Sequence, residues 1–249
     1  MDRMTAVAGA KQEVRERIWE LLEREGAARF PGTRGRIPNF PGAEAAAARL
    51  AELPEWRDAR VVKANPDAPQ LPVRATALAE GKQVYMAVPR LAEDQPFMLL
   101  DPDRLTTSPR RAASIRAASQ QAQKVGIDGV PRIDLVVCGT VAVNREGVRV
   151  GKGGGFSDLE FGLLAGAGSI DERTVLVTTV HPVQIVDGPL PETEHDFRVN
   201  RIVTAEEVIS CPRAKRPPGI LWDHLDEAKI AAVPALRDHG RAGPHGRSK

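Results

Sequence analysis

The chain has 249 residues, of which 42% are hydrophobic, enough for one large α/β domain or two small ones with a buried core. Its 35 lysines and arginines nearly balance 33 acidic residues, and a net charge of +2 excludes a general attraction to nucleic acid or anionic membranes. No apolar stretch is long enough to span a membrane, and the N-terminus lacks the apolar core of an export signal. We therefore expect a cytoplasmic protein without a membrane or nucleic-acid partner.

Hydrophobic spacing predicts the elements of the first half of the chain. An amphipathic helix is expected from Lys11 to about Ala28, because apolar residues recur there at helical spacing. An alanine-rich helix should follow over 43–53, closed by Pro54. Strands and helices then alternate, with strands predicted over 59–64 and 83–88 and helices over 71–80 and 109–124.

The second half continues this alternation. The apolar run IDLVVCGTVAV predicts one strand over 133–143, and TVAVNREGVRV predicts a β-hairpin with NREG as its turn. A helix over 156–167 and strands over 173–180 and 199–204 follow. The stretches 64–70, 187–196 and 211–219 are predicted to be irregular, and Cys138 is expected to be a buried reduced thiol far from Cys211.

Strands that alternate with helices are typical of a mostly parallel sheet covered on both faces. We therefore predict an α/β protein with a three-layer α/β/α, Rossmann-like fold. A single domain is expected over 1–235, followed by a basic tail at 236–249 that we expect to be disordered. Ligands of such folds usually bind in the loops at the strand ends.

The stretch GVRVGKGGGFSDLEFG, residues 147–162, has the composition of a phosphate-binding loop. It matches neither GxxxxGK[ST] nor GxGxxG, because Lys152 precedes three of the glycines and Phe156 stands where the third glycine of GxGxxG belongs. Glycines nevertheless let backbone N–H groups approach an anion, and a helix starting near Phe156 adds its partial positive charge. Arg149 and Lys152 supply full charges, and Asp158 could hold a phosphate-bridging metal. The alternative is a flexible loop in which Asp158 only favours the helix dipole.

The same stretch resembles the signature R-[LI]-G-x-G-x-G-[YF]-[YA]-D of the 5-formyltetrahydrofolate cyclo-ligase (5,10-methenyltetrahydrofolate synthetase) family, and here it runs from Arg149 to Asp158. Further agreement comes from KQEVR near the N-terminus, from Gln184 in VHPVQIVD and from DFRVNRIVT at 196–204. KQEVRERIWELLE, RIPNF and RPPGILWDHL are similar to the branch of methenyltetrahydrofolate synthetase domain-containing proteins. The resemblance covers about residues 11–235 and implies a CoA-transferase-like version of the predicted fold.

Vertebrate members of the branch append an RNA-recognition module, which has no counterpart here, so RNA binding is not expected.

The resemblance implies an ATP-dependent ligase that forms a C–N bond. With Mg²⁺, family members convert 5-formyltetrahydrofolate into 5,10-methenyltetrahydrofolate, ADP and phosphate: the formamide oxygen is phosphorylated, N10 attacks the activated carbon and phosphate leaves. Carried over by position, Asp158 would lie near Mg²⁺, and Asp67 would contact the formyl and N10 region, where family members have a glutamate. Catalytic roles are implied for Asp67, Arg149 and Lys152. The implied ATP ligands are Lys11, Arg15, Arg149, Gly151, Lys152, Gly153, Gly154, Gly155, Phe156 and Asp158.

Two departures from the family pattern leave alternatives open. Asp67 carries a shorter side chain than glutamate, and Ser157 replaces a tyrosine, so another formamide or amide is an alternative substrate to a reduced folate. A non-catalytic nucleotide- or folate-binding regulator is the second alternative. The expected partner is a small molecule, and the protein is expected to be a monomer or homodimer. His181 and His195 lack metal-ligand spacing with the cysteines; His181 is interpreted as a hydrogen-bonded structural residue at a strand end, and His195 with Asp196 as a pair on a loop surface.

Overall fold

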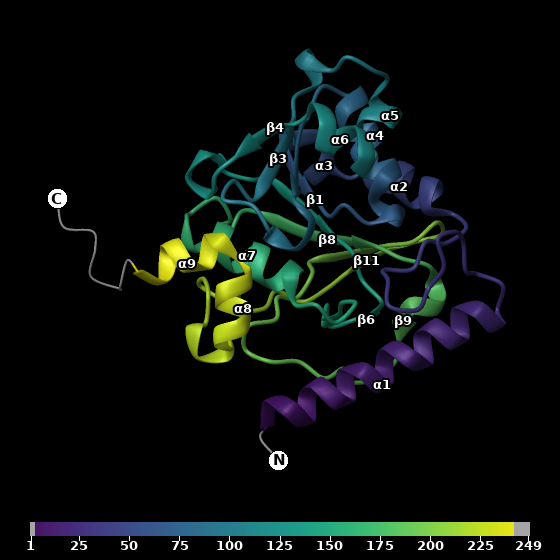
Figure 1. Ribbon diagram of the computed structural model, residues 1–249. Helices are drawn as coiled ribbons and strands as arrows, with labels where there is room; N and C mark the ends of the chain where they lie inside the picture. The colour runs from purple at the N-terminus through teal and green to yellow at the C-terminus, as the bar shows by residue number, and fades with distance from the viewer. Residues whose placement is uncertain (1–2, 242–249) are drawn as a thin grey trace.

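The computed structural model describes residues 3–241, and its largest element is a mixed sheet of eight strands (Figure 1). The bounds of its strands are β1 Val61–Ala64, β2 Gln83–Ala87, β3 Phe97–Leu100, β4 Gln123–Val125, β5 Leu135–Cys138, β8 Val175–Thr179, β10 Arg201–Val203 and β11 Val208–Ser210. The strand order is β11-β10-β8-β5-β1-β2-β3-β4. Strands β10, β8, β5, β1 and β2 run parallel to one another, whereas β11 at one edge and β3 and β4 at the other pair antiparallel.

Helices cover both faces of this sheet. The longer ones are α1 Arg3–Arg24, α2 Ala43–Ala51, α4 Leu71–Ala79, α7 Phe156–Gly166 and α9 Pro234–Arg241, and the shorter ones are α3 Pro54–Asp58, α5 Pro109–Ala112, α6 Ile115–Gln121 and α8 Glu227–Ala232. Because side chains alternate along a strand, Val84 and Val137 face α2 to α6, and Tyr85 and Val136 face α7 and α9. The predicted three-layer α/β/α fold with a mostly parallel sheet is confirmed.

A second, smaller sheet lies beside the large one and was not predicted. It has the order β7-β6-β9, with β6 Ala142–Asn144, β7 Arg149–Val150 and β9 Ile185–Val186. The pair β6 and β7 is antiparallel, which confirms the predicted hairpin. Helix α1 lies beside this sheet (Figure 1), and its Ile18, Trp19 and Leu22 belong to the same buried hydrophobic cluster as Val141 and Val150. The chain segment before the glycine loop therefore belongs to the small sheet, held by α1.

Two predicted elements are wrong in their extent. The single strand over 133–143 is two strands in different sheets, because the chain leaves the large sheet at Gly139, where a Cβ would lie 2.9 Å from Ile37. The helix over 109–124 is two short helices followed by β4, since Ser114 interrupts it and caps α6 by accepting a hydrogen bond from Ala117 N–H. Pro54 does not merely close a helix; it opens α3.

Other boundaries also shift. Helix α1 begins at Arg3 and ends at Arg24, ahead of Gly26, whose φ of 65° stops the helix. Strands β3, β4, β9 and β11 were not predicted. The stretches 187–196 and 211–219 contain neither helix nor strand, as predicted, whereas 64–70 includes the last residue of β1 and a short 3₁₀ turn.

The C-terminal prediction is only partly testable. Disorder of the tail is wrong for residues 236–241, because α9 continues to Arg241 and Leu236 is buried in the core beside α7. Residues 242–249 lie outside the described residues. Cys138 is a buried free thiol as predicted, Cys211 is also buried, and burial raises the pKa of both, that of Cys211 to about 11. Among the helices described, none has the length and apolar character needed to cross a membrane.

Candidate functional site

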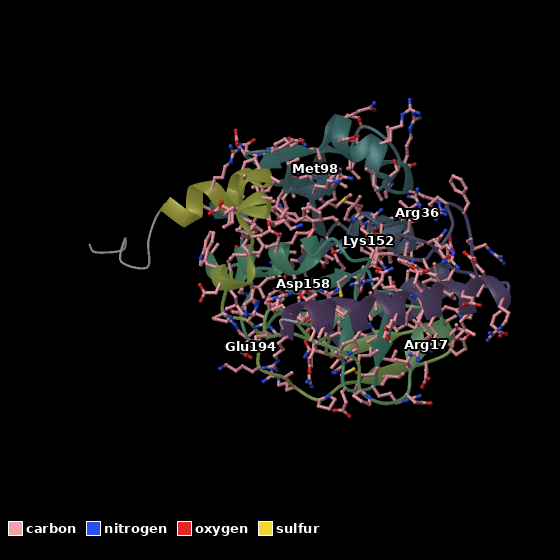
Figure 2. All side chains as sticks on the ribbon, turned by 60° about the horizontal axis from the view of Figure 1, so that its bottom comes forward. Arg17, Arg36, Met98, Lys152, Asp158 and Glu194 are labelled. Atoms are coloured by element: carbon pink, nitrogen blue, oxygen red, sulfur yellow. The ribbon has the colours of Figure 1, made fainter. Side chains whose placement is uncertain are left out.

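A cleft of about 850 Å³ opens at the carboxyl ends of β1, β2 and β5, between α1 and the start of α7. This is the usual ligand position in parallel α/β sheets. Lys152 and Asp158 lie just above α1 in the middle of Figure 2. The structure brings all the predicted site residues together, since the cleft is lined by Lys11, Arg15, Asp67, Arg149, Gly151, Lys152, Gly153, Gly154, Gly155, Phe156 and Asp158.

The glycine loop, residues 151–155, connects β7 to α7. Gly153 and Gly155 have φ of 109° and 69°, a conformation that side-chain-bearing residues rarely adopt, so glycine is required there. The Arg15 guanidinium on α1 donates a hydrogen bond to the carbonyl of Gly151 at 2.7 Å. Gly155 precedes α7 and offers no capping side chain, so the first N–H groups of the helix remain available to an anion.

Arg149 forms a charged contact in the cleft from a buried position. The residue is 3% exposed, lies over the ring of Phe197 and donates Nη2–H to Asp158 Oδ1 at 2.5 Å. Burial alone would lower the pKa of Arg149, but Asp158 and the other acidic groups nearby outweigh it, so the pKa is raised and the charge is kept. Its Nε–H is buried without a hydrogen-bond partner among the described residues, which leaves a donor for a ligand oxygen.

Two lysines of the cleft are also paired with carboxylates. Lys11 Nζ lies 2.5 Å from Asp196 Oδ2, and Lys152 Nζ lies 2.7 Å from Asp67 Oδ1. Burial would raise the pKa of Asp196, but Lys11 and the hydrogen bonds from Thr193 reverse this, and the pKa is lowered. Asp196 is a cleft residue that the sequence-based site assignment missed, although it opens the DFRVNRIVT segment that carries part of the resemblance.

The carboxylates of the cleft determine which metal it could hold. Within residues 3–241 no three His, Cys, Asp or Glu side chains come together as a ready-made metal site. Asp158 and Asp196 both line the cleft, and Mg²⁺ is commonly held by one or two carboxylates together with phosphate oxygens and water. Burial raises the pKa of Asp158, with Arg149 opposing. The donor set therefore fits Mg²⁺ when a phosphorylated ligand supplies the remaining oxygens.

A buried polar network forms the floor of the cleft and was missed in the sequence. Lys63 on β1 is paired with Glu160 on α7 and donates a hydrogen bond to Asn65 Oδ1 at 2.7 Å. Asn65 in turn donates to the hydroxyl of Ser157 at 3.3 Å. Ser157 is thus a small polar group inside this network. A lysine within an otherwise apolar strand gave no indication of its partner.

Arg74 on α4 fixes the segment that carries Asp67. Its guanidinium donates hydrogen bonds to the carbonyls of Asn65, Asp67 and Ala113, and the residue is 1% exposed. Burial lowers its pKa to about 10, which still leaves it charged at neutral pH. The Asp67 carboxylate is therefore presented to the cleft from a backbone that a buried cation holds in place.

The chain is similar in sequence to known proteins over most of its length. The profile of the 5-formyltetrahydrofolate cyclo-ligase family matches residues 7–205. Methenyltetrahydrofolate synthase domain-containing proteins of Mus musculus and Homo sapiens are 38% and 36% identical to the chain over 234 and 238 residues. These alignments cover 92% and 93% of this chain but only 63% and 62% of the relatives, so the chain spans less than two thirds of their length. The NMR structure of 5,10-methenyltetrahydrofolate synthetase from Aquifex aeolicus matches 84% of this chain and 94% of its own, at 20% identity and a TM-score of 0.48.

Proposed function

Because the chain belongs to the 5-formyltetrahydrofolate cyclo-ligase family, we propose that it catalyses the ATP- and Mg²⁺-dependent cyclisation of 5-formyltetrahydrofolate. The products would be 5,10-methenyltetrahydrofolate, ADP and phosphate. The observation that carries the proposal is the position of Asp67 opposite the glycine loop, joined to it through Lys152 at 2.7 Å. A carboxylate suited to a folate and a loop suited to phosphate thus face each other across one cleft, as a group transfer between two bound molecules requires.

Catalysis of phosphoryl transfer rests mainly on positioning and charge neutralisation. When bound, ATP would supply the phosphoryl group that turns the formamide oxygen into a leaving group. Lys11, Arg15, Arg149 and Lys152 would neutralise the phosphate charge, and the glycine loop would contribute backbone N–H groups. Asp158, with Asp196 beside it, would hold Mg²⁺. Asp67 would orient the formyl and N10 region of the folate.

The ion pairs of the cleft suggest how its residues accommodate both ligands. Lys152 is 44% exposed, so its ion pair with Asp67 is weak and the carboxylate oxygen can be exchanged for a phosphate oxygen at a small cost. That exchange would free Asp67 to face the folate. Lys11 can make the same exchange and release Asp196 toward Mg²⁺. Asp67 and Asp196 would therefore neutralise the two lysines only while the anionic ligand is absent.

Turnover tests the proposal directly. The protein would be incubated with ATP, Mg²⁺ and 5-formyltetrahydrofolate, and the absorbance of methenyltetrahydrofolate followed together with phosphate release. Both signals should rise together and should require ATP. Binding of ATP without either product would reject this folate as substrate.

Two alternatives have support in specific residues. Lys11, Arg149 and Lys152 are already paired with carboxylates, which is compatible with a non-catalytic regulator that binds a nucleotide or a folate. ATP binding measured by calorimetry, without phosphate release across a panel of folates, would favour this alternative. Another formamide or amide substrate is favoured by the short side chain of Asp67 and by Ser157, and phosphate release with such compounds alone would identify it. The cytoplasmic location, the oligomeric state and the single-domain division stay predictions.

A further inference from the structure

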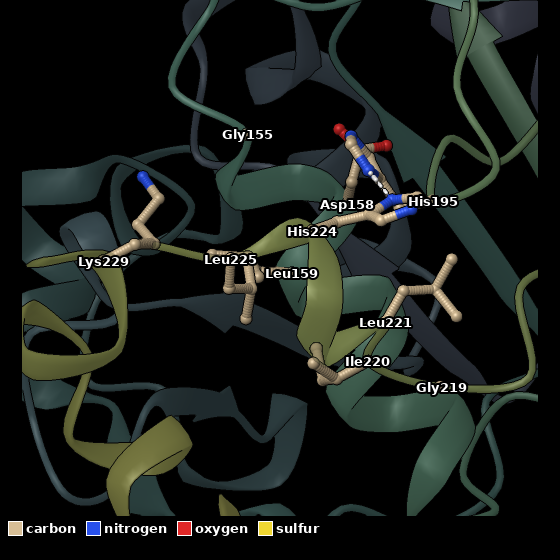
Figure 3. A pocket seen from close by; sticks show the side chains of 10 residues that line it. All are labelled: Gly155, Asp158, Leu159, His195, Gly219, Ile220, Leu221, His224, Leu225 and Lys229. Atoms are coloured by element: carbon tan, nitrogen blue, oxygen red, sulfur yellow. Dashed lines mark hydrogen bonds between the residues drawn. The ribbon is translucent and has the colours of Figure 1, made fainter. Parts of the chain in front are cut away.

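A second, smaller cavity lies beside the glycine loop. Its volume is about 140 Å³, and it is enclosed by the start of α7 and by the C-terminal segment 219–229 (Figure 3). The walls are mainly apolar, formed by Leu159, Ile220, Leu221 and Leu225, whereas His224 and other polar groups stand at the edge. An apolar slot with a few polar groups at one edge suits a planar heterocycle.

The cavity adjoins the main cleft at one end of the glycine loop. Gly155, Asp158 and His195 line both spaces. At the other end of the loop Lys152 contacts Asp67, whereas at this end Lys229 donates a hydrogen bond to the carbonyl of Gly154 at 2.8 Å. A molecule lying along the loop would therefore have one end at Asp67 and the other in the small cavity.

From this arrangement we propose that the small cavity binds the purine base of the nucleotide, and that the C-terminal segment completes the nucleotide site. The inference rests on the proposed function, because it requires the triphosphate to lie on the glycine loop. With the base in the cavity, the transferable phosphoryl group lies at the Lys152 end, next to Asp67. The reverse orientation would place the base beside the folate-facing carboxylate and the reacting phosphoryl group far from it.

The histidine pair at the cavity edge supplies a polar contact for the base. Nδ1 of His195 and Nδ1 of His224 lie 2.9 Å apart, so one ring donates its proton to the other. Nε2 of His195 is 3.0 Å from the Thr193 hydroxyl, which leaves Nε2 of His224 to meet the ring nitrogens or amino group of a purine. Lys229 also lies over the ring of Phe156 at 4.0 Å, which holds the C-terminal segment against the loop.

The segment that forms this cavity lies outside the part of the chain that the family profile describes, which ends at residue 205. The relatives' alignments cover 92% and 93% of the chain and so must extend beyond that residue. Base recognition by segment 219–229 would thus be an addition to the family's common core.

The test compares two ligands that differ only in the nucleoside. Calorimetry would measure the affinities of ATP and inorganic tripolyphosphate, both with Mg²⁺, for the full chain. Wild-type protein should bind ATP at least about tenfold more tightly, because the base buries apolar surface in the cavity. Leu221→Trp should fill the cavity and abolish that advantage while tripolyphosphate binding is kept. His224→Ala should reduce the advantage in part.

Trp222→Leu is the matched control, since Trp222 is the next residue in the same turn, is exposed and does not line the cavity. Unchanged tripolyphosphate affinity shows that each variant is folded. Equal affinities of the wild-type protein for ATP and tripolyphosphate would overturn the proposed base site but would not contradict phosphate binding by the glycine loop. An ATP advantage that survives Leu221→Trp would also overturn it. Failure of the wild-type protein to bind either ligand would overturn the phosphate loop, and the proposed function with it.

Discussion

Lys152 and Asp67 form an ion pair across the cleft, 2.7 Å between Nζ and Oδ1, from loops that are 85 positions apart in the sequence. The lysine is 44% exposed and the aspartate 13%. An ion pair with one exposed partner contributes at most about 1 kcal/mol to stability. The contact is therefore weak enough to be exchanged for contacts with ligands. Mutations of its two residues should have different effects on activity and on ATP binding.

Asp67→Asn should impair chemistry more than nucleotide binding. We expect kcat/KM for 5-formyltetrahydrofolate to fall roughly 100-fold, because a positioned carboxylate is lost. The Kd for ATP should stay the same or decrease, since Lys152 is released from its partner. Asp67→Glu is the control, which restores the family's residue and should keep most of the activity. Undiminished turnover in Asp67→Asn would show that Asp67 has no catalytic role.

Arg149→Ala and Lys152→Ala should both weaken ATP binding but differ in their effect on stability. Removing Arg149 leaves the partly buried Asp158 carboxylate, whose side chain is 16% exposed, without its partner and should lower the free energy of unfolding by roughly 3 kcal/mol. Removing the exposed Lys152 should lower it by less than about 1 kcal/mol. Urea denaturation and calorimetry check the two quantities separately. Equal losses of stability would contradict the difference in burial, and unchanged ATP affinity in both variants would show that phosphate binds elsewhere.

Gly155→Ala should be harmful where Gly151→Ala is tolerated. At a φ of 69° an alanine at 155 is strained by about 1–2 kcal/mol, and relief of that strain would shift the loop and the start of α7. At Gly151 a Cβ would be 3.4 Å from Arg149, an ordinary contact. Thermal unfolding and ATP affinity should both decline in the first variant and change little in the second. If stability and ATP affinity declined equally in both variants, glycine would be required because of the contacts of the loop and not because of its backbone conformation.

The Lys63–Glu160 pair should show strong coupling. Glu160→Leu alone leaves a buried ammonium group uncompensated and should reduce stability by roughly 3–5 kcal/mol. The double variant Lys63→Met/Glu160→Leu replaces both charges by apolar groups and should be more stable than Glu160→Leu. A double-mutant cycle in urea measures the coupling. Additive losses would mean that the two side chains do not act as a pair.

Stability should decrease on mild acidification through His181. Burial lowers the pKa of His181 below its ordinary 6.5, with Glu206 opposing, and its Nδ1 accepts a hydrogen bond from Val183 N–H. The unfolded state therefore binds a proton more readily than the folded state, and the free energy of unfolding should fall as the pH drops below about 6.5. His181→Asn should flatten this dependence in part, because His195 has a pKa lowered by burial as well. Parallel pH curves for the variant and the wild-type protein would exclude this contribution.

Local sequence patterns predicted the part of the site that is contiguous in the chain. Residues 149–158 combine a hairpin, a glycine turn and a helix start, and these local preferences agree with one another in the structure. The positions of Lys11, Arg15 and Asp67 in the same cleft came from the resemblance. The residues themselves gave no reason to bring these segments together, because the contacts are made by tertiary packing.

The elements that were missed have a common physical cause. The apolar run 133–143 is buried along its whole length, and hydrophobicity cannot show that its halves lie in two different sheets. The short strands β9 and β11 follow their pairing partners more than their own propensity. Lys63 and Asp196 have partners 97 and 185 positions away, and a charged residue gives no sign of which distant residue neutralises it.

The contacts of α1 have a consequence for how the protein folds. Lys11 reaches Asp196 across 185 positions, and Arg15 reaches Gly151 across 136. Contacts of such separation form only after most of the chain is ordered, since their loop-closure entropy must first be offset. The nucleotide site would then be completed late, when the first helix docks. Nucleotide would hold that helix in place by mass action, so the N-terminal segment should be the first part to become protease-sensitive when nucleotide is withdrawn.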